Sequence, residues 1–199
     1  VTMDTPTAPA DVHVADAAFT TLRKVSDANP QAREFALGAT EVVTWKSKDG
    51  LEVEGVLLKP VDYDPARRYP LLVVHDGFDY LAFANLQAIL DNMIHRLELP
   101  PLIAVMTQSE DRMHEYAADS KHADFIVKDL VPAMERLLPL VPDPAARGIM
   151  GASFGAVASL STAWRHPGFF GKLLLQSGSF VFTEIGHHDR GPVFDPVVE

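Results

Sequence analysis

A serine lies between two glycines in the stretch GASFG, residues 151 to 155, and this spacing matches the pattern Gly-x-Ser-x-Gly. Where this pattern serves catalysis, a strand ends at the motif, the serine occupies a sharp and strained turn, and a helix begins directly after it. The apolar residues GIM come before the serine, and the helix-forming stretch FGAVASLSTAW follows it. We therefore predict a nucleophile elbow in which Ser153 presents its hydroxyl for acyl transfer.

The two glycines have a steric reason to be there. Gly151 and Gly155 lack the Cβ atoms that would collide with the strand and the helix on either side of such a turn. Small residues also allow a strand and a helix to pack closely without any chemistry, which is the simpler interpretation. The position of the motif between a strand and a helix favours the catalytic one.

Backbone N–H groups would have to stabilise the negative oxygen that forms when Ser153 attacks a carbonyl group. The N–H of Phe154 lies at the expected start of the helix, where the helix dipole favours negative charge. A second candidate is the N–H of Phe78 in the stretch VVHDGFDY, because Gly77 permits a sharp turn at the carboxyl end of a strand. An ordinary Asp-Gly turn is the alternative.

The elements that would position these residues follow from the apolar runs. From residue 71 onward, three pairs of a continuous apolar strand and a helix precede a fourth strand, in the order LLVVH, FANLQAILDNMIHRL, LIAVMT, SKHADFIVKDLVPAMERLL, RGIMG, SFGAVASLSTAWRH and KLLLQSG. Strands that are buried on both faces lose their alternation, and this order builds a parallel sheet covered by helices. The predicted fold class is α/β.

Two β-rich runs, EVVTWKS and LEVEGVLLKP, come before this region and are separated by KDG. They predict an antiparallel hairpin in which Glu52 and Glu54 face outward. Residues 1–10 are rich in Thr, Pro and Ala, so we expect a loose terminus there, followed by a short helix in DAAFTTLRKV. The whole of 1–199 is expected to form a single α/β domain.

The composition narrows the class of protein. A chain of 199 residues with 47% hydrophobic residues can bury one substantial core, and its longest apolar runs are too short to span a membrane. A net charge of −10 disfavours a nucleic-acid partner, and the absence of cysteine excludes disulfides and thiolate chemistry. The chain begins at Val1 without a leader pattern, which leaves the compartment open between cytoplasmic and exported after leader removal.

Several stretches together carry a family resemblance. VVHDGFDY, RMHEY, KDLVPAMERLLPL and RGIMGASFGAVASLSTAWRHPGFFGKLLLQSGSF resemble the esterase D and enterochelin-esterase group of α/β-hydrolases over about residues 70 to 185. The resemblance implies hydrolysis of a small-molecule carboxylic ester without a cofactor, with Ser153 as nucleophile and the amides of Phe154 and Phe78 as oxyanion donors. It also implies that Arg112 contacts substrate. An ion pair between Arg112 and Glu115 is the structural alternative.

The first part of the chain resembles a different group. Residues from about 28 to 74, including VVTWKSKDGLEVEGVLLKPVDYDPARRYPLLVV, are similar to the lead-in of the catalytic domain of prolyl-oligopeptidase-like serine peptidases. The resemblance makes a peptidase or acyl-peptide hydrolase the alternative function, and it leaves a natural and an engineered mosaic both open. The strand ends in His75-Asp76-Gly77, which departs from the peptidase pattern and agrees with the esterase group.

The residues that should complete the site are missing from their usual places. In this fold an acid and then a histidine follow the serine on later strands, but only VFTEIGHHDRGPVFDPVVE remains after the last predicted strand. We therefore expect a fold truncated before its last strands, with the base supplied outside this chain, for which a second chain is one source. A truncated or mosaic scaffold without activity is the remaining alternative.

The eight histidines were weighed as substitute bases or metal ligands. His187 and His188 follow the last strand, but their order and loop are wrong for the triad of this fold. The stretch HHD finds no matching ligand spacing elsewhere, so no metal site is predicted. His75 is expected to be structural, and surface positions are expected for His95, His114 and His122.

Overall fold

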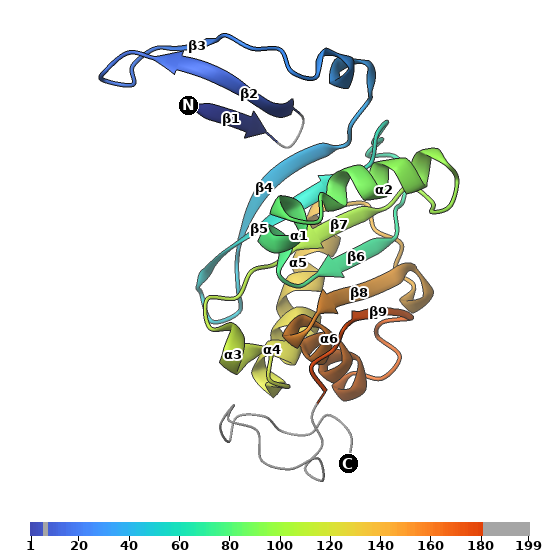
Figure 1. Cartoon of the computed structure of the whole chain (residues 1–199). Coiled ribbons are helices and arrows are strands. Elements are labelled where there is room, and N and C mark those ends of the chain that lie inside the picture. Colours follow the sequence, from blue (N-terminus) through green and yellow to red (C-terminus); the bar gives the residue numbers. More distant parts are fainter. Residues whose placement is uncertain (6–7, 181–199) are drawn as a thin grey trace.

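The computed structural model describes residues 1–5 and 8–180 and is built around a six-stranded sheet (Figure 1). The strand order is β4-β5-β7-β6-β8-β9. The strands β6, β7, β8 and β9 run parallel to one another, whereas β5 pairs antiparallel with both β4 and β7. The sheet is therefore mostly parallel with an antiparallel hairpin at one edge, as the sequence predicts.

The hairpin consists of β4 (Ala39–Lys46) and β5 (Glu52–Lys59). Its turn contains Gly50 with a φ of 90°, a conformation that glycine adopts without strain. Val53, Gly55 and Leu57 turn toward the interior while Glu52 and Glu54 are exposed, which confirms the predicted two-faced strand.

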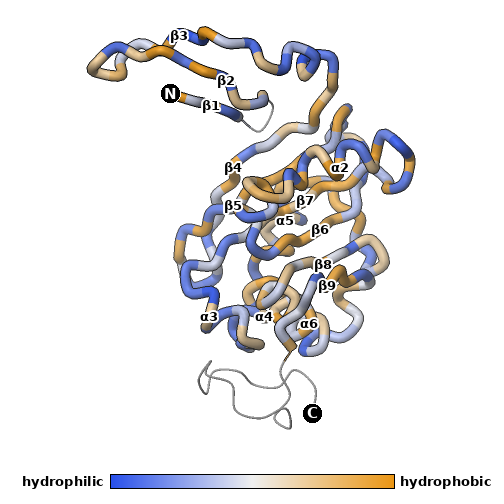
Figure 2. The backbone as a smooth tube through the Cα atoms, viewed as in Figure 1, coloured by the Kyte–Doolittle hydropathy of each residue, from blue (hydrophilic) through white to orange (hydrophobic). Residues whose placement is uncertain are grey.

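The parallel strands are short and almost wholly apolar. They are β6 (Leu71–Val74), β7 (Ile103–Met106), β8 (Arg147–Ala152) and β9 (Lys172–Gln176). All four residues of β7 are buried because helices cover both faces of the sheet at its centre. Figure 2 shows hydrophobic residues concentrated along these strands.

Helices form one layer on each face of the sheet. On one face lie α1 (Gly77–Ala82) and α2 (Leu86–His95), whose Tyr80, Leu86 and Leu90 pack on the sheet. The other face is covered by helical segments at 120–137 and 154–165, in detail α4 (Ser120–Phe125), a π-helical turn (Ile126–Leu130), α5 (Val131–Leu137) and α6 (Phe154–Arg165). The short helix α3 (Arg112–Glu115) follows β7. In the described ranges no helix is long and apolar enough to cross a membrane.

The N-terminal segment differs from the expectation. Instead of a loose terminus and a short helix, it forms a three-stranded antiparallel sheet of β1 (Thr2–Thr5), β2 (Ala8–Ala15) and β3 (Leu22–Lys24). A one-turn 3-10 helix, Pro30–Glu34, then leads to β4, and a second one, Pro144–Ala146, leads to β8. The buried Asp11 carboxylate organises this sheet by accepting hydrogen bonds from the Ser26 hydroxyl at 2.7 Å and the Ala28 N–H at 2.9 Å.

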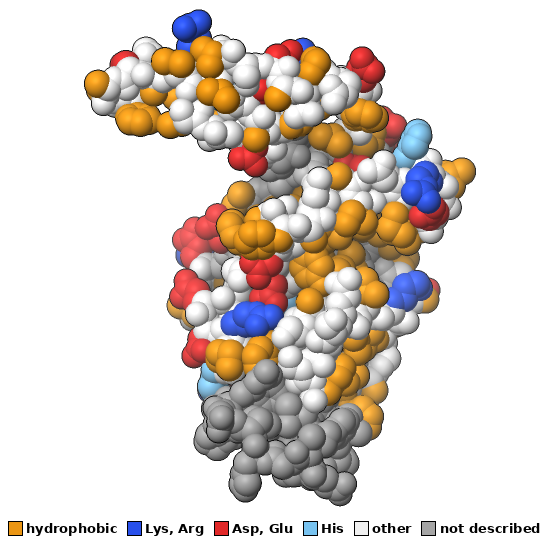
Figure 3. All heavy atoms as spheres, viewed as in Figure 1, with side chains coloured by type: hydrophobic (Ala, Val, Ile, Leu, Met, Phe, Trp, Pro, Cys, Tyr) orange, Lys and Arg blue, Asp and Glu red, His pale blue; other side chains and the backbone are white. Residues whose placement is uncertain are grey.

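This N-terminal sheet stands apart from the body in Figure 1, and Figure 3 shows hydrophobic side chains on its surface. Its valines Val12, Val14 and Val25 are each about half exposed. The sequence expectation failed here because Pro and Ala are poor strand formers individually, whereas a buried carboxylate with several donors can still join the strands.

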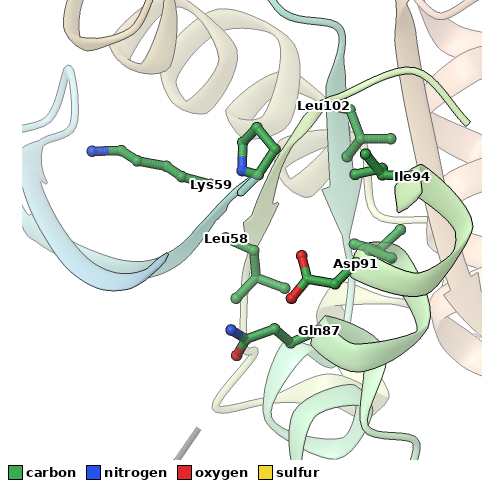
Figure 4. A pocket seen from close by; sticks show the side chains of 8 residues that line it. Leu58, Lys59, Gln87, Asp91, Ile94 and Leu102 are labelled. Atoms are coloured by element: carbon green, nitrogen blue, oxygen red, sulfur yellow. The ribbon is translucent and has the colours of Figure 1, made fainter. Parts of the chain in front are cut away.

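A small pocket lies between β5 and α2, where Leu58, Lys59, Gln87, Asp91, Ile94 and Leu102 surround it (Figure 4). Its polar side chains already have partners in the segment before β4. Asp91 accepts a hydrogen bond from the Gly38 N–H at 2.9 Å, and Gln87 donates to the Gly38 carbonyl at 2.7 Å. We conclude that these side chains anchor the hairpin on α2, and none of them belongs to the site described next.

Candidate active site

Ser153 lies in the tight turn between β8 and α6 with a φ of 54° and a ψ of −114°. A positive φ is strained for a residue that has a Cβ atom, so the surrounding contacts must hold the turn in place. The Ser153 N–H donates to the Gln176 carbonyl at the end of the neighbouring strand β9, at 2.9 Å. The side chain is half-buried. The strand, turn and helix that the motif requires are therefore all present.

The two glycines on either side allow close approach of the backbone, with a clash for a larger residue at Gly151 and a tight contact at Gly155. A Cβ atom at Gly151 would lie 2.4 Å from the carbonyl carbon and oxygen of Gly155, which is a clash with backbone. A Cβ atom at Gly155 would lie 3.2 Å from the Asp76 Oδ2 and the His75 Cβ. The steric role expected for Gly151 is confirmed, and the start of α6 packs directly against the end of β6.

Phe154 is the first residue of α6, and its side chain is buried. The Cζ of the Arg112 guanidinium lies over the Phe154 ring, 5.5 Å from the ring centroid. Phe78 lies in the first turn of α1, after Asp76 has turned the chain with a φ of 55°. The Phe78 N–H donates to the side-chain oxygen of Gln108 at 3.2 Å, and the Phe78 ring is 66% exposed. Both turns open at the carboxyl ends of paired strands, since β6 and β8 run parallel in register.

Arg112 forms a two-pronged ion pair with Asp76 rather than a pair with Glu115. Its Nε and Nη2 each donate to one Asp76 carboxylate oxygen at 2.8 Å, and Nη2 also lies 3.3 Å from the Ala152 carbonyl oxygen. The neighbouring Asp76 carboxylate raises the pKa of the Arg112 guanidinium. The Asp76 side chain is 4% exposed and that of Arg112 is 33% exposed. Arg112 thus joins the β6–α1 turn to the residue before Ser153.

Ser179, which the sequence analysis did not single out, is in contact with Ser153. The two Oγ atoms lie 2.9 Å apart, and the Ser179 N–H donates to the Ser153 carbonyl at 3.2 Å. The Tyr80 hydroxyl on α1 donates to the side-chain oxygen of Gln176, the last residue of β9 before the loop that carries Ser179. The signal available in the sequence was the run QSGS at the carboxyl end of a strand that neighbours the serine-bearing strand.

The histidines are distributed differently from the expectation. His95 and His114 are exposed as predicted, but His122 is buried and its Nε2 lies 3.0 Å from the Nε2 of the fully buried His75. His122 was misplaced because its polar neighbours in the sequence, Lys121 and Asp124, lie on the outer side of α4. His187 and His188 fall outside the described residues. Within the described ranges no three His, Cys, Asp or Glu side chains gather as a metal site.

Burial controls the protonation of the two inner histidines. Removal from water lowers the pKa of His75 to about 4 and that of His122 to about 3, because each imidazolium would have to be desolvated. Arg112 adds a further lowering at His75, and His75 does so at His122. Both rings are therefore neutral near pH 7.

Comparisons with known proteins agree on one family. The family model described as "Putative esterase" matches residues 50–189. The iron(III) enterobactin esterase of Escherichia coli O6:H1 is 28% identical over 169 residues, which cover 83% of this chain and 42% of that protein. The chain thus spans less than half the length of this curated relative.

Solved structures agree on the fold. The enterobactin esterase of Shigella flexneri, crystallised in the presence of enterobactin, superposes with a TM-score of 0.66 at 23% identity over 75% of this chain and 39% of that one. A ferulic acid esterase of Anaeromyces mucronatus superposes with a TM-score of 0.63 at 18% identity over 72% of this chain and 60% of that one. These similarities confirm the α/β-hydrolase fold, and the family model, which matches most of the chain, shows that this chain belongs to the esterase family.

Proposed function

We propose that this chain carries the nucleophile and oxyanion side of a serine carboxylic-ester hydrolase. The observation that carries the proposal is the strained conformation of Ser153, with a φ of 54°, between the carboxyl end of β8 and the first residue of α6. Strain of this kind persists only where the surrounding structure enforces it, and it is common at catalytic residues. Membership of the esterase family supports the same chemistry.

In the proposed reaction the Ser153 Oγ attacks the carbonyl carbon of an ester. The new bond from Oγ to carbon moves the carbonyl electron pair onto oxygen, and collapse of this tetrahedral species expels the alcohol and leaves an acyl-serine. Water then attacks the acyl-serine, releases the carboxylic acid and restores the hydroxyl. The proton that Oγ loses on attack must pass to a base and from there to the departing alcohol.

Two backbone N–H groups are proposed to stabilise the negative oxygen. The N–H of Phe154 lies at the N-terminus of α6, where the helix dipole adds to its hydrogen bond. The N–H of Phe78 donates to the Gln108 side chain at 3.2 Å, so the exposed Gln108 must turn away before this N–H can bind substrate. The contact of α6 with the end of β6 supports a common site for the two turns.

The base is proposed to lie outside the described residues. The two histidines buried beside this turn, His75 and His122, bond to each other, and in the described part of the chain the Ser153 Oγ pairs with Ser179. Residues 181–199, a further part of the same protein and a second chain are candidate sources of a base. Labelling experiments with and without an added second polypeptide would distinguish them.

Arg112 is proposed to contact the substrate. Its pair with Asp76 fixes the guanidinium over the Phe154 ring, and the 33% exposure of its side chain leaves part of it open to solvent. A fixed guanidinium beside the nucleophile suits a small ester that carries an acidic or phenolic group. The relatives named for enterobactin and ferulic acid esters support this substrate class.

Covalent labelling tests the proposal directly. We expect a fluorophosphonate probe to label the chain at Ser153, and the variant Ser153→Ala to lose the label, while Ser120→Ala, an exposed serine at the start of α4, keeps it. Turnover of short acyl esters without cleavage of aminoacyl amides would separate an esterase from the peptidase alternative. A well-folded chain that stays unlabelled both alone and with the added second polypeptide would overturn the proposal in favour of an inactive scaffold.

A further inference from the structure

A buried chain of hydrogen bonds connects three side chains behind the Ser153 turn. His122 on α4 reaches His75 through their Nε2 atoms at 3.0 Å, and the His75 Nδ1 reaches the Ser159 Oγ on α6, also at 3.0 Å. The Ser159 hydroxyl donates to the Gly155 carbonyl in the first turn of α6 at 2.7 Å. We call His122, His75 and Ser159 the histidine chain.

The partners of the histidine chain determine where its hydrogens lie. A carbonyl oxygen only accepts, so the Ser159 hydroxyl must give its hydrogen to Gly155 and can then only accept from His75. The His75 Nδ1 also faces the Met150 carbonyl oxygen at 3.2 Å, so this nitrogen carries the hydrogen. In a neutral imidazole the other nitrogen is an acceptor, and the Nε2 of His122 must therefore be the donor.

The histidine chain holds both sides of the strained turn. On the strand side, His75 contacts Met150 through its Nδ1 at 3.2 Å and through its backbone N–H at 3.0 Å. On the helix side, it reaches Gly155 by way of Ser159. Met150 and Gly155 flank Ser153, so the three buried side chains fix the backbone that enters and leaves the turn.

We propose that the histidine chain positions Ser153, and that it does so only while both of its imidazoles are neutral. A second hydrogen on the His75 Nε2 would face the hydrogen of the His122 Nε2 across 3.0 Å, where two donors repel. Relief of that repulsion requires the rings to move, and His75 would then release Met150 or Ser159. The proposal depends on the proposed function only in taking Ser153 as the nucleophile.

The charged groups around the histidine chain act in opposite directions. From α3, Arg112 disfavours a positive charge on His75, whereas the Glu115 carboxylate lies 3.8 Å from the His122 Nδ1 and favours one there. Asp119, at the start of α4, also favours a charge on His122. At His122 the effect of burial is larger than that of the two carboxylates, and burial lowers the pKa of both His75 and His122. Tyr116 packs on both rings without contributing a charge near neutral pH.

The first test reads the tautomers and does not require any activity. In long-range proton–nitrogen NMR spectra of the full chain with ¹⁵N-labelled histidine, signals of all eight histidines are present. Among them we expect neutral rings at pH 6 for His75, hydrogenated at Nδ1, and for His122, hydrogenated at Nε2. The variant His122→Gln assigns them by removing the Nε2-hydrogenated ring. A cationic His75 or His122 ring at pH 6, or the same tautomer in these two rings, would overturn the proposal.

The second test asks whether the histidine chain positions the turn. The variant Ser159→Ala removes the link from His75 to α6, and Thr162→Val is its matched control. Thr162 lies on the same helix and is fully buried, and its hydroxyl donates in the same way to the Ala158 carbonyl at 2.8 Å. Its only bond to a histidine in the described chain is made by its backbone carbonyl, which accepts from the His166 N–H and which the Val variant keeps. Exchange of the Ser153 amide hydrogen should accelerate by about 10-fold in Ser159→Ala and by less than about 2-fold in Thr162→Val.

Labelling by the fluorophosphonate should follow the same pattern, slower by about 5-fold in Ser159→Ala and nearly unchanged in Thr162→Val. A glutamine amide can replace the Nε2 donor, so His122→Gln should retain the wild-type rate, whereas His122→Leu should not. Equal exchange and labelling in the Ser159 and Thr162 variants would refute positioning. If the wild-type chain is not labelled even with the added second polypeptide, the proposed function fails, and amide exchange at Ser153 still decides the role of the histidine chain.

Discussion

The Oγ atoms of Ser153 and Ser179 lie 2.9 Å apart, and the Ser179 N–H also donates to the Ser153 carbonyl at 3.2 Å. The loop after β9 therefore lies over the turn that carries the proposed nucleophile. A hydroxyl that is held by a second hydroxyl has fewer orientations to lose when it attacks.

Removal of this contact should slow the chemistry without unfolding the chain. We expect Ser179→Ala to reduce the rate of fluorophosphonate labelling by about 5-fold, equivalent to one hydrogen bond of about 1 kcal/mol. Ser177→Ala, an exposed serine in the same loop, should leave the rate unchanged. An unchanged rate in Ser179→Ala would mean that the contact does not orient the nucleophile.

The fit of the glycines predicts a large effect on stability. Gly151→Ala should lower the free energy of unfolding by about 3 kcal/mol or more, because its Cβ would lie 2.4 Å from the Gly155 backbone. Gly148→Ala in the same strand is the control, since its Cβ would meet the end of the Leu72 side chain at 3.1 Å, and a side chain can move. Urea denaturation of both variants measures the difference, and equal losses would contradict the clash.

The buried histidines predict acid sensitivity. Their pKa values in the folded chain, about 4 for His75 and about 3 for His122, lie below the usual value near 6.5, so between these limits the unfolded chain binds more protons. The contribution of the two neutral histidines to the free energy of unfolding should therefore be complete above about pH 6.5 and decrease as the pH falls toward 4.

Urea denaturation across this range measures the effect, which should amount to a few kcal/mol, about 1.4 kcal/mol per unit of pKa difference. The double variant His75→Gln with His122→Gln should show a much flatter profile between pH 6.5 and 4. A profile as steep as that of the wild type would assign the acid sensitivity to other groups.

The ion pair of Asp76 and Arg112 predicts non-additive effects. Arg112→Met should cost about 3–5 kcal/mol in unfolding free energy, because it leaves the Asp76 carboxylate, 4% exposed, without its partner. Adding Asp76→Asn removes that buried charge and should recover part of the loss.

The exposed pair of Arg33 and Asp27 provides the comparison. Arg33→Met should cost much less than Arg112→Met in unfolding free energy, because water and salt screen an exposed pair. If the losses from Arg112→Met and Asp76→Asn simply add, the two side chains do not act as a unit.

The sequence predicts well what is encoded locally. The turn at Ser153 was found because the motif, the strand before it and the helix after it are contiguous, and the apolar runs located all four parallel strands. The hairpin was found because its two runs alternate and flank a glycine. In each case the decisive residues are neighbours in the chain.

What depends on distant contacts was missed. The partner of Arg112 is Asp76 from the turn after β6 and not Glu115 one turn away, and no local pattern distinguishes the two. His122 looks like a surface residue beside its charged neighbours, but the packing of α4 places it against His75. In the N-terminal sheet the buried Asp11 carboxylate adds to the backbone pairing of the strands, and its donors Ser26 and Ala28 lie 15 and 17 residues away in the chain.

The outer edge of β9 has a consequence for handling the protein. In the part of the chain that the structure describes, β9 is bonded to β8 on one side only, and Leu173 and Leu174 are 40% and 52% exposed. The backbone N–H and C=O groups on that unpaired side can form hydrogen bonds with an extended peptide, which would add a further strand to the sheet. Concentrated samples of this chain should therefore self-associate through β9 unless another segment pairs with this edge. The variant Leu174→Lys should reduce this self-association, because a charged side chain at a sheet edge disfavours pairing with another strand.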